Sequence, residues 1–149
     1  WESRLSAPTG KASVTLTGSH YFGLGLRFIR AMDANGTFWN ADNEPGVVFR
    51  GEERLVRSNW CAYTAPVDGE EVTVAMLGHP NNPRHPTTWF TMAKLFAYLS
   101  GTIGLHDKPL KIAEGKPLKL RYGIALWDRA VDSEEIDRLY QRWQSHIME

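Results

Sequence analysis

The stretch YFGLGLRFI, residues 21–29, is the clearest β-strand in the sequence. Side chains alternate between the two faces of a strand, so this stretch presents one face of large apolar residues and one of small or charged residues. The apolar face carries Phe22, Leu24, Leu26 and Phe28. The opposite face carries Gly23, Gly25 and Arg27. The pattern predicts a strand with one face in a core.

Shorter runs with strand character recur along the chain and are separated by Gly, Pro, Asn and Asp at short intervals. They cover residues 13–17, 47–50, 60–64, 72–77, 89–92 and 118–127. Residues 72–77 are apolar on both faces, which is typical of a central strand. Residues 93–99 fit either a helical turn or an extended run. The spacing is typical of an all-β protein, mainly an antiparallel β-sandwich.

The last element is predicted to be an α-helix that begins after Asp132. Asp132 is suited to cap the helix, and Glu135 stands at the capping-box position. Apolar residues then recur at helical spacing, which predicts a stripe that packs on the outside of the sheet. They are Ile136, Leu139, Tyr140, Trp143 and Ile147. We expect residues 1–149 to form a single β-sandwich domain, or the C-terminal half of a larger one, with this C-terminal α-helix.

The composition excludes several classes of protein. The chain has 149 residues, with 17 Lys and Arg against 17 Asp and Glu, and this balance argues against nucleic-acid binding, which needs clustered positive charge. Its apolar runs are far shorter than the roughly 20 residues that span a bilayer, so we expect a soluble chain that does not span a membrane. The single cysteine, Cys61, excludes an internal disulfide and leaves the compartment unknown.

The connection GHPNNPRHPTT, residues 78–88, combines two imidazoles and two amides in a loop that its prolines stiffen. Such a loop suits catalysis or ligand binding, because histidine exchanges protons near neutral pH. We interpret His79 and His85 as candidate catalytic residues, and Asn81 and Asn82 as candidate ligand-binding residues. The alternative is structural: these side chains satisfy the backbone of the loop.

Arg27 shares its strand face with two glycines. Glycine inside a strand often marks the close approach of a ligand, and a guanidinium beside such a strip suits an anion or a polyhydroxylated ligand. We therefore expect Arg27 to bind ligand, in a hollow that has the glycines as its floor and the histidine-bearing loop above it. A bulged strand with an ion-paired or solvated arginine is the alternative.

Three further residues complete the candidate ligand-binding set. Trp60 lies near a turn and Trp89 directly follows the histidine-bearing loop, so either ring is a candidate stacking platform for a sugar. Core packing is the alternative for both. His20 adds a third imidazole to those of the loop, but the spacing is not that of a known metal motif. Metal and cofactor are therefore left unknown.

Three stretches, taken in order, resemble one family: GLGLR at residues 23–27, Trp60 followed by Asp68-Gly69, and HPNNPRHPTTWF at residues 79–90. Residues 115–122 and the closing helix also fit. Over nearly its whole length the chain resembles the C-terminal half of the bacterial PmoA-like family, whose members carry a methane-oxygenase label and are essentially uncharacterised. The resemblance implies a galactose-mutarotase-like supersandwich, in a domain of about 300 residues, with an N-terminal half as partner. The label itself does not fit, because particulate methane oxygenase is an integral membrane enzyme.

Two kinds of function agree with these observations. The first is a carbohydrate-binding or carbohydrate-processing protein that takes a sugar-like small molecule at a His- and Arg-lined site on the sandwich. The second is a non-catalytic binding or interaction module, because ALWDRAVDSEEI, residues 125–136, resembles the closing segment of laminin-G-like jelly rolls. Whether the chain is an enzyme is left open between them.

Overall fold

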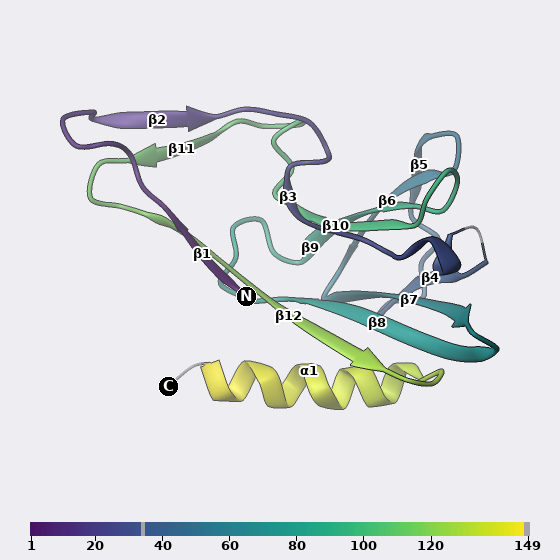
Figure 1. The fold of residues 1–149 in the computed structure, drawn as a ribbon. Helices are drawn as coiled ribbons and strands as arrows, with labels where there is room; N and C mark the ends of the chain where they lie inside the picture. Colours follow the sequence, from purple (N-terminus) through teal and green to yellow (C-terminus); the bar gives the residue numbers. More distant parts are fainter. Residues whose placement is uncertain (34, 148–149) are drawn as a thin grey trace.

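The computed structural model describes residues 1–33 and 35–147 and consists of β-strands followed by one α-helix (Figure 1). The strands are β1 (Glu2–Leu5), β2 (Ser13–Leu16), β3 (Gly23–Arg27), β4 (Thr37–Asn40), β5 (Val47–Arg50), β6 (Glu53–Ser58), β7 (Trp60–Val67), β8 (Glu70–Gly78), β9 (Thr87–Met92), β10 (Tyr98–Thr102), β11 (Leu110–Ala113) and β12 (Leu118–Trp127). The helices are a 3-10 turn, η1 (Arg30–Met32), and α1 (Ser133–Ile147). The predicted fold class, an all-β sandwich with a C-terminal helix, is confirmed.

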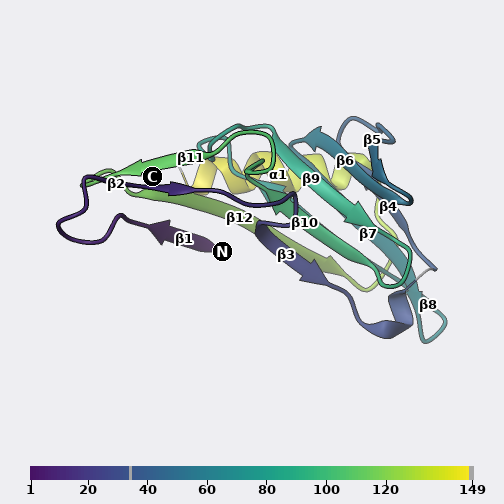
Figure 2. The ribbon, with the colours of Figure 1, turned by 90° about the horizontal axis from the view of Figure 1, so that it is seen from above.

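Two five-stranded antiparallel sheets form the sandwich. One has the strand order β1-β12-β8-β7-β4, and the other has the order β3-β10-β9-β6-β5. Figure 1 shows α1 below the first sheet and the second sheet above it, so the molecule has three layers. The two-stranded ribbon of β2 and β11 projects from one end of the sandwich (Figure 2).

Strand β8 lies in the centre of the first sheet, between β12 and β7, as the apolar run at residues 72–77 predicts. Its alternate side chains enter opposite layers. Val74 and Met76 join the core between the two sheets, whereas Ala75 and Leu77 join the cluster between this sheet and α1. Both faces of β8 are apolar because both faces of this sheet are covered.

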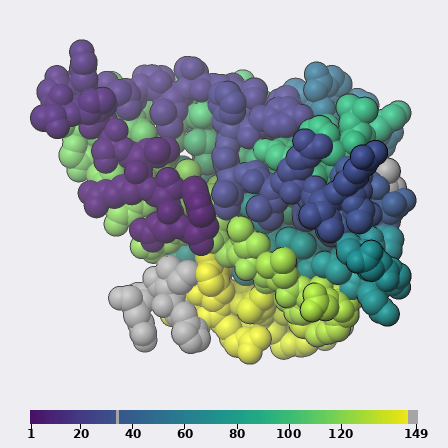
Figure 3. All heavy atoms as spheres, in the orientation of Figure 1, coloured from purple at the N-terminus to yellow at the C-terminus, as the bar shows by residue number. Residues whose placement is uncertain are grey.

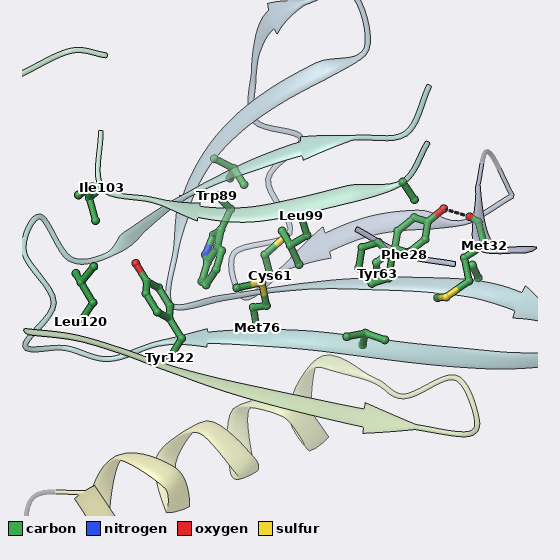
Figure 4. Close-up of a cluster of buried hydrophobic side chains, with 14 of the residues drawn as sticks. Phe28, Met32, Cys61, Tyr63, Met76, Trp89, Leu99, Ile103, Leu120 and Tyr122 are labelled. Carbon is green, nitrogen blue, oxygen red and sulfur yellow. Dashed lines mark hydrogen bonds between the residues drawn. The ribbon is translucent and has the colours of Figure 1, made fainter. Parts of the chain in front are cut away.

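Phe28, Tyr63, Trp89 and Tyr122 lie among aliphatic and sulfur-containing side chains in the core between the sheets (Figure 4). Trp89 points from β9 into this layer, where its ring centroid lies 6.3 Å from that of Tyr122, and its Nε1–H donates to the Ser58 carbonyl at 2.9 Å. Farther along the layer, the Tyr63 hydroxyl donates to the Met32 carbonyl at 2.6 Å, the bond drawn as a dashed line in Figure 4. These large rings are buried without leaving their polar atoms unpaired, as a stable core requires.

Helix α1 covers the outer face of the first sheet. The Glu135 N–H donates to Asp132 Oδ1 at 2.8 Å, so the predicted N-cap is confirmed. Ile136 and Tyr140 are buried in one cluster with Trp60, as the helical spacing predicts. Figure 3 shows the helix, in yellow, along the lower edge of the molecule. No described helix has the length and apolar character needed to cross a membrane.

The strand at residues 21–29 is shorter than its pattern predicts. It is β3, which spans Gly23–Arg27, and Phe22 lies outside it with 52% of its surface exposed. Leu24 and Leu26 pack against the core as expected. The ambiguous residues 93–97 form a bend, and the residues that follow it begin β10, which pairs with β3.

Candidate functional site

Residues 79–86, which we call the histidine loop, join β8 to β9 through a series of tight turns. The Asn82 N–H donates to the His79 carbonyl at 2.9 Å, and the His85 N–H donates to the Asn82 carbonyl at 3.3 Å. Arg84 adopts the left-handed conformation, with φ of 64°. Because the prolines of this loop offer no amide donor, side chains supply part of its hydrogen bonding.

The Asn82 side chain attaches the loop to β12. Its Nδ2 donates to the Arg121 carbonyl at 2.7 Å, and its Oδ1 accepts the Arg121 N–H, also at 2.7 Å. The last residue pair between β8 and β12 is Gly78 with Tyr122. The Asn82 amide therefore continues the hydrogen-bond ladder beyond the end of β8. The His79 N–H also donates to the Arg121 carbonyl, at 3.2 Å.

His79 is buried at the start of the loop, with 1% of its surface exposed. Its Nδ1 accepts the Asn81 N–H at 3.0 Å, so the proton of the neutral ring is on Nε2. Nε2 is buried and has no hydrogen-bond partner among the described residues. Burial lowers the pKa of His79, and the positive charge of Arg121 lowers it further. His79 is therefore a neutral donor near neutral pH.

His85 is half-buried near the end of the loop. Its Nδ1 likewise has no partner within residues 1–33 and 35–147. Burial lowers the pKa of His85, and the charges of His79 and Arg57 add to this effect. Arg57 also donates to the carbonyls of Arg84 and His85, both at 3.3 Å. His79 thus acts electrostatically on His85.

Two more buried polar atoms lie at the base of the loop. Ser58 Oγ and Thr87 Oγ1 have no hydrogen-bond partner among the described residues, and these two residues are paired between β6 and β9. Thr87 Oγ1 occupies the space that a Cβ atom on Gly78 would need, which explains the glycine there. The base of the loop therefore keeps hydrogen-bonding capacity that the described residues do not use.

A hollow of about 580 Å³, which we call the basic hollow, adjoins the end of the histidine loop. It is lined by the apolar Val47 and Leu55, by the basic Arg57, Arg84, His106 and Lys108, and by Thr88, Gly104 and Asp107. Arg57 and Thr88 face each other across β6 and β9. The wall opposite them is the segment 104–108, which follows β10.

Arg84 holds this wall in place. Its Nη1 donates to the carbonyls of Ile103 and Gly104 at 2.8 and 2.7 Å, and its Nη2 donates to the Pro109 carbonyl at 3.1 Å. The carbonyls are neutral, so the guanidinium keeps its charge at the hollow. With Arg57 and Lys108, three permanent positive charges line the hollow against one carboxylate, Asp107.

His20 lies in an aromatic cluster on the sheet that contains β5 and β9. Its ring centroid is 3.9 Å from that of Phe49 and 4.7 Å from that of Phe90. It also lies 6.2 Å from the ring of His106, which lines the basic hollow. His20 is 8% exposed, and burial lowers its pKa. The structure therefore associates His20 with the basic hollow through His106.

A smaller pocket, of about 220 Å³, opens at the start of the histidine loop, and we call it the His79 pocket. It is lined by His79, Asn81, Asn82, Lys119 and Arg121. None of these residues lines the basic hollow. Three of the four predicted site residues of the histidine loop lie at this pocket. His79 and Pro80 also border a third hollow, of about 320 Å³, beside α1.

Arg27 does not border either hollow. Its guanidinium lies over the ring of Phe96, 4.1 Å from the centroid. The Tyr98 hydroxyl fills the space beside Gly25, and Gly23 is packed against the backbone of β10. The expected hollow with a glycine floor and an arginine edge is therefore wrong. The glycines are needed because a neighbouring side chain and a neighbouring strand approach closely.

Trp60 and Trp89 are both fully buried. Trp60 lies between the first sheet and α1, where its Nε1–H donates to Asp137 Oδ1 at 2.7 Å. Trp89 lies in the core between the two sheets. Neither ring presents a face to solvent, so neither offers a stacking surface in this conformation. The aromatic count alone does not distinguish core rings from binding rings.

Six basic residues of the two hollows were missed from the sequence: Arg57, Arg84, His106, Lys108, Lys119 and Arg121. Lys119 and Arg121 had a usable signal, because they alternate with apolar residues along the strand 118–127 and so share its polar face. Arg57 and Lys108 come from distant parts of the chain, and strand pairing alone brings them together. No local sequence pattern predicts that Arg57 and Lys108 line the same hollow.

The described residues contain no group of three or more His, Cys, Asp or Glu side chains that could hold a metal ion. Cys61 is buried, and burial raises the pKa of its thiol, which makes it a poor nucleophile. The arrangement offers positive charge and hydrogen-bond donors. It is therefore suited to bind an anionic or polyhydroxylated small molecule.

The fold and the two hollows define a helix-covered antiparallel β-sandwich with basic surface sites. The chain belongs to a family described as a family of unknown function (DUF6807), whose model matches residues 1–141. No curated protein and no solved structure matches the chain. The family match does not test the PmoA-like resemblance, which stays a prediction.

Proposed function

We propose that this protein binds an acidic sugar in the basic hollow. The observation that carries the proposal is the lining of that hollow, where apolar side chains stand beside three permanent positive charges and one carboxylate. A uronic acid has matching parts, since its ring carries C–H groups, hydroxyl groups and one carboxylate. Its size also suits a hollow of about 580 Å³.

Each part of such a ligand has a counterpart in the hollow. Arg57 and Lys108 supply positive charge for the carboxylate. Val47 offers an apolar surface for the C–H groups of the ring, while Thr88 and Asp107 offer hydrogen-bonding groups for its hydroxyls. An apolar wall with a few polar groups that fix orientation is the usual design of a small-molecule site.

In this hollow we propose binding, with no acid–base role for the two histidines of the loop. A general acid or base must lie within hydrogen-bond reach of the group it protonates or deprotonates, and neither His79 nor His85 lines the hollow. The contribution of the histidine loop is positional. Arg84 holds the 103–109 segment, and Arg57 is fixed by the loop carbonyls that it contacts.

Isothermal titration calorimetry with D-glucuronate, and with D-glucose as the matched neutral ligand, tests the proposal. We expect saturable binding of the acid and weaker binding of the neutral sugar. Lys108→Gln removes one exposed charge and should weaken glucuronate binding about fivefold. Lys116→Gln is the matched control, because Lys116 is an exposed lysine outside both hollows.

Equal affinity for glucose and glucuronate would refute the role given to the positive charges. If neither sugar binds saturably to the folded protein, the carbohydrate proposal fails and the non-catalytic interaction module becomes the better hypothesis.

A further inference from the structure

The His79 pocket has a chemistry of its own. Its lining contains an ammonium, a guanidinium, an imidazole and two amides, and it contains no carboxylate. Lys119 and Arg121 are two residues apart on β12, so their side chains lie on the same face of the strand, opposite Leu120 in the core. Both cations therefore face one small space of about 220 Å³.

The buried imidazole adds a donor that has no partner. His79 Nδ1 is occupied by the Asn81 N–H, which places the proton of the neutral ring on Nε2. This Nε2–H lies in a side chain that is 1% exposed, and no described residue accepts its hydrogen bond. A buried donor without an acceptor is costly, and His79 lines this pocket, so an occupant whose acceptor atoms reached Nε2 would relieve that cost.

Glu2 sets the charge of the pocket. The β1–β12 register places Glu2 opposite Arg121, and the Arg121 Nε–H donates to Glu2 Oε2 at 2.7 Å. Glu2 is half-exposed and does not line the pocket. It neutralises one of the two positive charges, so an incoming anion competes with Glu2 for Arg121.

The amide of Asn82 is already committed to the backbone of Arg121 through two bonds. It therefore fixes the pocket and does not serve as the main ligand donor. The groups left to contact an occupant are the Lys119 ammonium and the guanidinium nitrogens of Arg121 that do not bond Glu2. The His79 Nε2–H is buried in the free protein, so it becomes a third contact only when the imidazole shifts toward the occupant. Oxyanions such as carboxylate and phosphate accept several charge-assisted hydrogen bonds at once.

We propose that the His79 pocket binds a small oxyanion, a carboxylate or phosphate group, through Lys119, Arg121 and His79. The volume of about 220 Å³ is sufficient for one such group. This site is independent of the proposed function, because the two hollows share no lining residue.

Long-range ¹H–¹⁵N NMR spectra of the histidine side chains test the proposal. The protein is titrated with inorganic phosphate in one series and with acetate in the other, both at constant ionic strength set by sodium chloride. We expect a saturable shift of the His79 Nε2 resonance in at least one series. Lys119→Gln should weaken that binding about fivefold, because it removes one exposed positive charge.

The variant Glu2→Gln separates a ligand site from a merely structural cluster, because it should tighten anion binding several-fold by freeing Arg121. Lys108→Gln and Lys116→Gln should leave the titration unchanged, although the first of them weakens glucuronate binding in the basic hollow. A His79 shift that stays linear, or that chloride reproduces, would overturn the proposal. Unaltered affinity in Lys119→Gln would do the same.

Discussion

The attachment of the histidine loop to β12 predicts the cost of removing one amide. Asn82 is 6% exposed, and its side chain makes both of its bonds to the backbone of Arg121. The substitution Asn82→Ala deletes both bonds without adding volume. The Arg121 N–H and the Arg121 carbonyl are affected differently, because the His79 N–H still donates to the carbonyl at 3.2 Å.

The magnitude follows from these two groups. The Arg121 N–H loses its acceptor, which costs roughly 1–3 kcal/mol. The carbonyl keeps one partner and loses only the net value of a second bond, about 0.5–1.5 kcal/mol. We therefore expect the free energy of unfolding to fall by roughly 1.5–4.5 kcal/mol, which for a chain of this length lowers Tm by about 10 °C.

Urea and thermal unfolding of the variant measure this loss, and hydrogen exchange at the Arg121 amide locates it. Asn81→Ala is the matched control, since the Asn81 side chain is exposed and surface substitutions usually change stability by less than about 0.5 kcal/mol. If the two variants lose equal stability, or if the Arg121 amide stays protected in Asn82→Ala, the reasoning about this ladder is refuted.

Two further predictions concern the same region and its buried histidines. Burial lowers the pKa of His20, His79 and His85 below the ordinary value of 6.5, so the unfolded chain takes up protons first as the pH falls. The free energy of unfolding should therefore be highest above about pH 6.5 and should decline as the pH falls through the lowered pKa values. Urea titrations at several pH values measure this decline. A free energy of unfolding that stays constant between about pH 7.5 and pH 5 would contradict the prediction. Gly78→Ala should destabilise the protein by about 1–3 kcal/mol, because the new Cβ would collide with Thr87 Oγ1. The double variant with Thr87→Ala should recover part of this loss in thermal unfolding, and strict additivity of the two changes would disprove the collision.

The sheet architecture could be predicted from local patterns because burial follows strand alternation. The run at residues 72–77 predicts a central strand, and the helical stripe after Asp132 predicts a helix on the outer face; both are confirmed. The ends of β3 were less predictable. Phe22 matches the apolar pattern but lies beyond the last residue pair with β10, where tertiary contacts decide exposure.

The candidate site could be predicted only in part. The pattern around His79 and His85 indicates a loop that carries two imidazoles, but it does not separate a ligand-contacting amide from one that serves the backbone, as Asn82 does. Arg27 shows a second limit. Its glycine neighbours are explained by close packing against Tyr98 and β10. The local sequence does not distinguish glycines needed for such packing from glycines that line a ligand site.

The edge-on contact between His79 and Trp143, with ring centroids 5.6 Å apart, has a practical use. Indole emission responds to the charge and polarity of the groups that contact the ring. Trp143 contacts the His79 imidazole, so protonation of His79 or binding in the His79 pocket should change its emission. The other five tryptophans give a background signal that a Trp143→Phe variant measures; among them Trp60 and Trp89 are enclosed and hydrogen-bonded. The molecule therefore has a native fluorophore beside the histidine loop, and events there can be followed optically without attaching a label.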